Sequence, residues 1–230
     1  MAKCDNDAVE LLSNVFEKSS ERLGKALIGL DYPNGGRRNS ILHENNLIIH
    51  IAHELIERGF HCYAEAAVGK GSIDLIAGDG KLAVAIEAKM FGDPRERACG
   101  IKRDLERMGK FVPHRDPLSQ LNNPTRACQW WAAAQERWGV IVIGHQRAGD
   151  EVIETAWTTP DDEDAARLIK QGNKSRHRDT TIEQITESFI ALRKTLRDKG
   201  AHFGAKEICD DTPWPGTDGA WLLWAAFRLD

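Results

Sequence analysis

Two short apolar runs joined by a glycine turn constrain the fold of this chain more than any other segment. The runs are Ile73-Asp74-Leu75-Ile76-Ala77 and residues 81–89 (KLAVAIEAK), and Gly78-Asp79-Gly80 separates them. Both are short, rich in aliphatic and β-branched residues, and bounded by glycine. This pattern predicts a β-hairpin.

The second run carries its charges on one of its two faces. Because side chains alternate along a strand, Glu87 and Lys89 point to the same side as two small alanines, and the bulky aliphatic residues point to the other. On the neighbouring strand, Asp74 aligns with Glu87. Two carboxylates and an ammonium group held together can bind a hard divalent cation against a phosphate. The alternative interpretation is an ordinary ion pair at a sheet edge.

A helix is predicted upstream, from Ser40 as the N-cap to Gly59 as the C-terminal stop. Glu44 falls within the apolar stripe of this helix, where a carboxylate costs desolvation unless it has a partner such as a metal or its bound water. The alternative is a first-turn glutamate that reaches solvent and interacts with the helix dipole. The apolar stripe contains Leu47, Ile48, Ile51 and Leu55, and the polar arc predicted to be exposed contains His43, Asn46, His50, His53, Glu54 and Glu57.

The order of these elements resembles the PD-(D/E)XK nuclease superfamily. The likeness rests on a helix with Glu44, a strand near residues 60–67, a strand with Asp74 and a strand ending in Glu87-Ala88-Lys89. It covers roughly residues 40–145. It implies an α/β fold with a restriction-endonuclease-like α-β-β-β-α-β core, in which helices flank a central mixed sheet. Ile73 stands where the family name has proline, and no glutamine-containing accessory motif follows the strand, so no subfamily is assigned.

The resemblance also implies a role for each site residue. Asp74 and Glu87 would bind Mg²⁺ (or Mn²⁺) together with the backbone carbonyl of Ala88. Lys89 would orient or activate the attacking water, and Glu44 would support the metal shell. The implied function is a metal-dependent nuclease that hydrolyses phosphodiester bonds of DNA. Two alternatives remain open: a catalytically silent nuclease-like module that binds nucleic acid or acts as a scaffold, and a nuclease toxin or defence effector.

Composition limits the remaining possibilities. The chain has 230 residues, 41% hydrophobic residues and seven tryptophans, which is enough for a well-packed core. It contains no apolar run long enough for a membrane helix, and its start lacks the apolar segment of a signal peptide. The five cysteines are scattered without a CxxC pair, which favours reduced thiols and a cytoplasmic location over a structural zinc site. A monomer and a homodimer both remain open.

The net charge of −4 gives no overall basic surface for nucleic acid. Contacts to DNA phosphates would therefore come from local groups of basic residues, although each group is also compatible with ordinary solvated surface. Three groups are candidates: the pair before the Glu44 helix, the pair on the helix after the Glu-x-Lys strand, and a later basic loop. Their members are Arg37, Arg38, Arg103, Arg107, Lys174, Arg176 and Arg178.

We expect one domain built from three consecutive parts. Residues 1–39 form an N-terminal helical extension packed on the core, residues 40–149 form the nuclease-like core, and residues 150–230 form a largely helical addition that completes the same domain. Further elements are expected as a tryptophan-rich helix at about 125–138, a strand at 140–144, a strand at 151–158, a helix beginning near Asp161, an amphipathic helix from Ile182 and a buried strand at 221–227.

Overall fold

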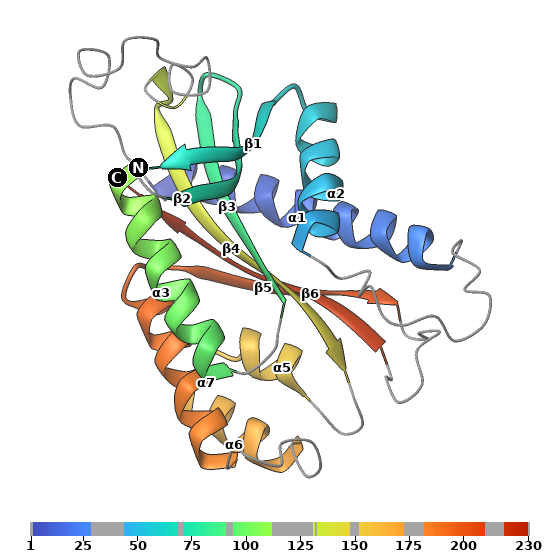
Figure 1. Ribbon diagram of the computed structural model, residues 1–230, viewed down its shortest axis with the longest axis vertical. Coiled ribbons are helices and arrows are strands. Elements are labelled where there is room, and N and C mark those ends of the chain that lie inside the picture. Colours follow the sequence, from blue (N-terminus) through green and yellow to red (C-terminus); the bar gives the residue numbers. More distant parts are fainter. Residues whose placement is uncertain are drawn as a thin grey trace.

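The computed structural model describes residues 2–28, 44–68, 71–90, 94–111, 131, 133–147, 152–172, 182–209 and 219–229. The fold is α/β, with helices on both faces of a mixed six-stranded sheet (Figure 1). None of the described helices is both long enough and apolar enough to cross a membrane.

The strand order in the sheet is β1-β2-β3-β4-β6-β5. Strands β3 and β4 run parallel, and the other neighbouring pairs run antiparallel. A parallel pair needs a crossover connection, and α3 lies between β3 and β4 in the chain. The strands are β1 (His61–Val68), β2 (Gly71–Gly78), β3 (Leu82–Met90), β4 (Glu136–Arg147), β5 (His202–Cys209) and β6 (Gly219–Arg228).

The hairpin predicted from the two apolar runs is confirmed as β2 and β3. Leu75 pairs with Ile86 in the antiparallel register. The turn is closed by Asp79, whose carboxylate accepts hydrogen bonds from the backbone N–H groups of Lys81 and Leu82, each at 2.8 Å. Gly80 has a φ of 92°, a backbone conformation that glycine adopts without a steric penalty.

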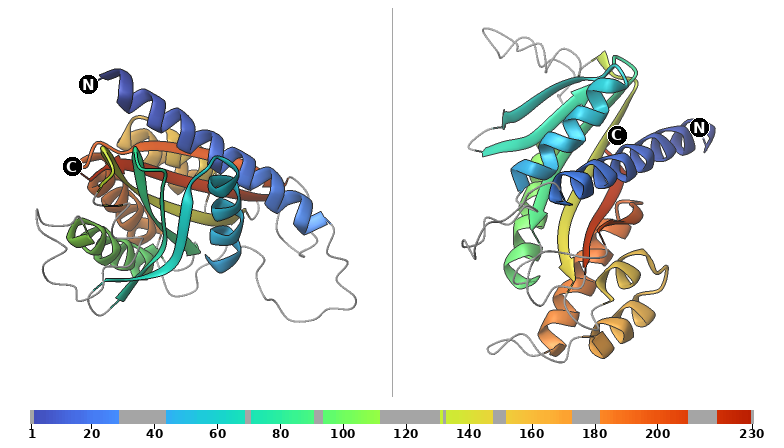
Figure 2. Two further views of the ribbon diagram at one scale, coloured as in Figure 1. Left: turned by 90° about the horizontal axis from the view of Figure 1, so that it is seen from above. Right: turned by 90° about the vertical axis from the view of Figure 1, so that its right-hand side faces the viewer.

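Helices cover the two faces of the sheet in unequal numbers (Figure 2). One face packs against α1 and α2, and the core on the other face is shared with α3, α5 and α7, while α6 packs on α5 and α7. The bounds are α1 (Ala2–Ile28), α2 (Glu44–Glu57), α3 (Pro94–Phe111), α5 (Ile153–Thr158), α6 (Asp162–Gly172) and α7 (Ile182–Arg197).

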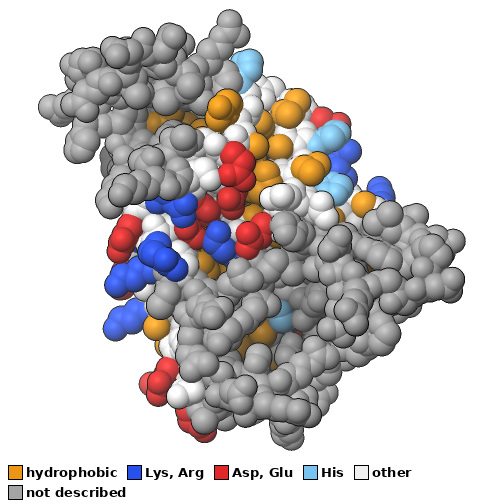
Figure 3. Space-filling view, in the orientation of Figure 1, with side chains coloured by type: hydrophobic (Ala, Val, Ile, Leu, Met, Phe, Trp, Pro, Cys, Tyr) orange, Lys and Arg blue, Asp and Glu red, His pale blue; other side chains and the backbone are white. Residues whose placement is uncertain are grey.

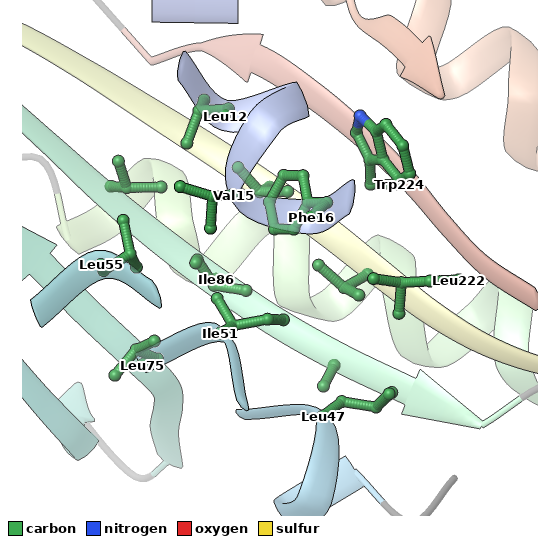
Figure 4. Packing of buried hydrophobic residues seen from close by; sticks show 14 of the residues in the cluster. Leu12, Val15, Phe16, Leu47, Ile51, Leu55, Leu75, Ile86, Leu222 and Trp224 are labelled. Carbon is green, nitrogen blue, oxygen red and sulfur yellow. The ribbon is translucent and has the colours of Figure 1, made fainter. Parts of the chain in front are cut away.

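The face beneath α1 and α2 is an apolar core. The rings of Phe16 on α1 and Trp224 on β6 lie 5.3 Å apart between centroids. Because the β3 residues on this side are all aliphatic, α2 packs on them through its own aliphatic stripe. Figure 4 shows how the side chains from α1, α2 and three strands meet; those labelled are Leu12, Val15, Phe16, Leu47, Ile51, Leu55, Leu75, Ile86, Leu222 and Trp224.

Residues 153–158, predicted as most of a strand at 151–158, instead form the short helix α5, so that prediction was wrong. Buried Arg193 on α7 explains the difference, because its guanidinium donates hydrogen bonds to the carbonyls of Ala156, Trp157 and Thr159 at the end of the helix. A helix end leaves such carbonyls without partners inside the helix. Residue types within 151–158 carry no information about this distant donor.

Two further expectations need correction. Trp138 was assigned to the end of a helix, but it lies in β4, which begins at Glu136 because Glu136 pairs with Leu82 at the start of β3. The C-terminal addition is also less helical than expected. It contributes β5 and β6, which extend the sheet beyond β4. The strand at 221–227 was expected, whereas β5 was not.

The crossing of α1 over β5 depends on a glycine, and this provides a test of the fold. A Cβ atom built on Gly24 would overlap the backbone carbonyl of Ile208, which cannot rotate away. We expect Gly24→Ala to lower the free energy of unfolding by about 1–3 kcal/mol, the usual range for overpacking. Urea denaturation monitored by circular dichroism measures this change.

The matched control is Gly109→Ala on α3, where a new Cβ meets nothing within 4 Å. Alanine has the higher helix propensity, so this variant should keep or gain up to about 1 kcal/mol of stability. Equal effects of the two substitutions would contradict the close contact of α1 with β5.

Candidate active site

A pair of carboxylates lies where the ladder between β2 and β3 ends. The last backbone pair is Leu75 with Ile86, and the next residues are Asp74 and Glu87. Beyond this point the Asp74 side chain replaces the backbone as the hydrogen-bond partner of β3. Its Oδ2 accepts a 2.8 Å hydrogen bond from the backbone N–H of Ala88. The sequence prediction that Asp74 lies beside Glu87 is consistent with this register.

Glu87 points to the side of the sheet that α3 covers. Its neighbours Ala83 and Ala85 belong to the core beneath α3, whereas Ile86 and Ala88 belong to the core beneath α2. Only 1% of Glu87 is exposed. Its Oε1 accepts no hydrogen bond from the residues that the structure describes. Such an oxygen is costly to bury.

Burial is the largest cause of an unusual acidity at Glu87. Desolvation, followed by the negative charge of Asp74, raises the pKa of Glu87 to about 7, although Lys89 and Arg107 act in the opposite direction. A hydrogen-bonding contact with the Asp74 carboxyl also contributes to this raised pKa. Two adjacent carboxyl groups that favour a shared proton are also well placed to share a cation.

Lys89 lies on the same face, two residues further along β3. Its Nζ is 3.4 Å from Oε2 of Glu87 and 3.2 Å from Oδ2 of Asp104. The side chain is 15% exposed. The ammonium group therefore lies between two carboxylates at the border between the core and solvent.

Asp104 on α3 belongs to this cluster and was missed in the sequence. It is 4% exposed and forms an ion pair with Arg107. The signal was present: Asp104 follows Ile101 by three residues and precedes Met108 by four, and both are buried. It therefore falls within the apolar stripe of its helix. The argument that identified Glu44 applies equally to this aspartate.

Arg107 is part of the cluster, although the sequence suggested a DNA contact for it. Its Nη1 donates a 2.6 Å hydrogen bond to the carbonyl of Ser72, and its Nη2 pairs with Asp104. Nη2 also lies 3.6 Å from Oε1 of Glu87, which is an ionic contact beyond hydrogen-bond range. Figure 3 shows acidic and basic side chains gathered where α3 borders the sheet. Arg103 on the same helix is exposed.

Glu44 is the first residue of α2 and is half-buried. Its helix packs on the face of the sheet opposite to that of Glu87, so a role for Glu44 in the site stays a prediction. His53 is exposed as expected, whereas His50 is half-buried and its pKa is lowered by burial and then by the charge of Arg22. Five of the basic candidates lie outside the described residues: Arg37, Arg38, Lys174, Arg176 and Arg178.

A second acidic cluster lies on α2, and it corrects the prediction that Glu54 is exposed. Glu54 is 3% exposed because α1 packs over it. Arg22 of α1 forms ion pairs with both Glu54 and Glu57, and Arg58 donates a 2.6 Å hydrogen bond to Glu54. Burial alone would raise the pKa of Glu54, but the hydrogen bonds from Arg58 and Arg22 outweigh it and lower this pKa.

This second cluster is poorly suited to a cation. In the described part of the chain, His53, Glu54 and Glu57 are the group of three whose ligand atoms all lie within 4.8 Å of one another. Two arginines already neutralise its carboxylates. We therefore assign this cluster to the joint between α1 and α2.

The Asp74–Glu87 pair fits a hard divalent ion better. Carboxylate and carbonyl oxygens are the ligands that Mg²⁺ prefers, and the pair offers a buried oxygen to which none of the described residues donates a hydrogen bond. The backbone carbonyl of Ala88 is the further donor that the sequence suggested. Comparisons of the chain with protein-family models, with curated proteins and with solved structures found no match. The assignment of a function therefore rests on this site and on the order of the elements around it.

The raised pKa of Glu87 predicts a pH-dependent loss of stability. An ordinary glutamate releases its proton near pH 4.5, whereas folded Glu87 keeps it up to about pH 7. Between these values the unfolded state binds fewer protons, so the free energy of unfolding falls as the pH rises. At about 1.4 kcal/mol per pKa unit, the whole loss is at most about 3 kcal/mol.

The variant Glu87→Gln removes this loss because the amide does not ionise. Without divalent ions, we expect it to be more stable than wild type by about 3 kcal/mol at pH 8 and by less than about 1 kcal/mol at pH 5, as measured by urea denaturation. Glu183→Gln on the exposed surface of α7 controls for the removal of one carboxylate. A stability difference that is the same at both pH values would contradict the raised pKa.

Proposed function

We propose that this protein is a metal-dependent nuclease that hydrolyses phosphodiester bonds of DNA, with a restriction-endonuclease-like core of the PD-(D/E)XK type. The observation that carries the proposal is the buried Asp74–Glu87 pair with Lys89 two residues further along the same strand face. The element order α2-β1-β2-β3-α3-β4, with β3 parallel to β4, supports the same family.

Asp74 and Glu87, with the carbonyl of Ala88, are the groups that would hold Mg²⁺ or Mn²⁺. A bound ion of this kind polarises a phosphate and lowers the pKa of a coordinated water. The role of Lys89 follows from its position beside the Glu87 carboxylate. Its ammonium donates hydrogen bonds to the attacking water, fixes the direction of attack and offsets negative charge that develops on the phosphate.

The charges of the cluster match this substrate. With every group ionised, three carboxylates (Asp74, Glu87 and Asp104) face two cations (Lys89 and Arg107), which leaves one negative charge. A proton on Glu87 makes the cluster neutral. With a divalent ion present and Glu87 ionised, the same groups carry one net positive charge. A phosphodiester carries one negative charge, so the loaded site and its substrate are complementary.

The DNA backbone would approach from the side of α3. Lys102 and Arg103 are exposed on this helix, which also carries two members of the site. Phosphate contacts of this kind orient the duplex and carry little sequence information. Arg37, Arg38, Lys174, Arg176 and Arg178 remain candidates for further contacts.

The proposal predicts that the purified protein cleaves DNA when Mg²⁺ or Mn²⁺ is added and not when it is chelated. Asp74→Ala, Glu87→Ala and Lys89→Ala should each lower the cleavage rate about 100-fold or more, which is typical for the loss of one preorganised electrostatic group. Calorimetry separates their roles: the two carboxylate variants should lose Mg²⁺ affinity, whereas Lys89→Ala should retain it. Gel-based cleavage of plasmid and linear DNA measures the rates.

The control is Lys170→Ala, which removes an exposed cation on α6 and should cleave like wild type. Lys89→Ala with nearly wild-type turnover would disprove the assigned mechanism. A wild-type protein that binds DNA but leaves it intact with both metals would instead support the silent binding or scaffolding module.

A further inference from the structure

Asp104 is the point where the helix α3 is connected to the two charged strands. Its Oδ2 lies 3.2 Å from Nζ of Lys89 on β3, and its Oδ1 pairs with Arg107. Arg107 in turn donates a 2.6 Å hydrogen bond to the carbonyl of Ser72, two residues before Asp74 on β2. One buried carboxylate therefore connects α3 with both strands that carry the proposed metal ligands.

Packing alone gives no reason for an aspartate here. Asp104 is 4% exposed and lies among the buried side chains of α3, where an aliphatic residue would pack without desolvation. Asp104 forms ion pairs with Lys89 and Arg107, and each of these two cations is partly exposed to solvent. Asp104 therefore serves the placement of these two cations.

Asp104 is set apart from the proposed metal ligands. Among the described residues, its carboxylate oxygens and those of Asp74 and Glu87 do not all lie within 4.8 Å of one another. Lys89 lies between Asp104 and Glu87: its nitrogen donates a 3.4 Å hydrogen bond to Glu87 and makes a 3.2 Å ionic contact, without hydrogen-bond geometry, with Asp104. A lysine ammonium sits on a flexible four-carbon chain, so opposite charge on two sides restricts its position more than one contact does.

We propose that Asp104 is a positioning residue for the hydrolysis. It holds the Lys89 ammonium beside the Asp74–Glu87 pair and keeps the Arg107 guanidinium in the same cluster. This inference rests on the proposed nuclease function and adds to it a residue that the family motif does not include. Among the described residues, loss of Asp104 leaves Lys89 with Glu87 as its ion-pair partner and leaves Arg107, beside its hydrogen bond to the Ser72 carbonyl, with only the 3.6 Å ionic contact to Glu87.

Asp104→Asn tests this role, because it removes the charge and keeps the shape. We expect kcat to fall about 10- to 100-fold, the usual effect of losing a residue that orients a ligand or catalytic group. KM for DNA and the Mg²⁺ affinity measured by calorimetry should change much less, because Asp74 and Glu87 are untouched. Asp104→Glu keeps the charge and should recover part of kcat.

A second readout does not depend on cleavage. In metal-free protein, Lys89 should react with an acetylating reagent more slowly than the exposed Lys170, as followed by peptide mass spectrometry. Asp104→Asn should speed the labelling of Lys89 relative to Lys170 by about threefold or more, the size expected for loss of a partly exposed ion pair. If Asp104→Asn does not fold by circular dichroism, Asp104→Ser replaces it in both measurements.

Glu106→Gln is the matched control, since it changes an exposed carboxylate on the same helix and should affect neither readout. Wild-type kcat in Asp104→Asn, or unchanged labelling of Lys89, overturns the positioning role while the nuclease function stands. A wild-type protein without metal-dependent cleavage overturns the nuclease function and the role of Asp104 in hydrolysis together. In that case faster labelling of Lys89 would leave only a structural ion pair.

Discussion

Burying the carboxylate of Glu87 between the sheet and α3 is the constraint on which the site depends. A charged group in such a place is unfavourable unless opposite charge is supplied or a proton is retained. The chain uses both means. Lys89 and Arg107 approach the carboxylate, yet its pKa is still raised to about 7. The two cations thus offset the cost of burying the Glu87 charge only in part. A divalent ion would supply the missing positive charge.

Two of the buried glutamates, Glu54 and Glu87, show how the surroundings of a carboxyl group set its pKa. Glu54 is buried beneath α1 but receives two arginines, and its pKa is lowered. Glu87 is buried beneath α3 beside a second carboxylate, and its pKa is raised. The first arrangement stabilises a helix joint. The second keeps a carboxyl group poised near neutral pH, the range in which general acids and bases operate.

The two faces of the sheet differ in what they contribute. On one face α1 and α2 pack on an apolar core that supplies burial energy without charged groups from β3. On the other face the apolar core beneath α3 and α7 is interrupted, next to two alanines of β3, by the cluster of Asp74, Glu87, Lys89 and Asp104. An apolar core on one side of a strand and charge on the other follow from the alternation of side chains. The charged cluster therefore lies on one face of β3, and the opposite face of this strand packs in the apolar core beneath α2.

The sequence alone determined the local features whose cause is local. The hairpin of β2 and β3, the alternation that separates Glu87 and Lys89 from the aliphatic residues, the helices α1, α2 and α7 and the buried strand β6 all follow from periodicity and turn residues. The position of Asp104 in an apolar stripe was also readable, although it was not recognised. Tertiary structure decided whatever depends on a distant partner. The helix α5 ends on carbonyls that Arg193 of α7 satisfies, Glu54 is buried because Arg22 of α1 covers it, and Arg107 turns into the site because Asp104 and the Ser72 carbonyl hold it there. These outcomes depend on contacts between residues far apart in the chain, and such contacts leave no trace in the local pattern of residue types.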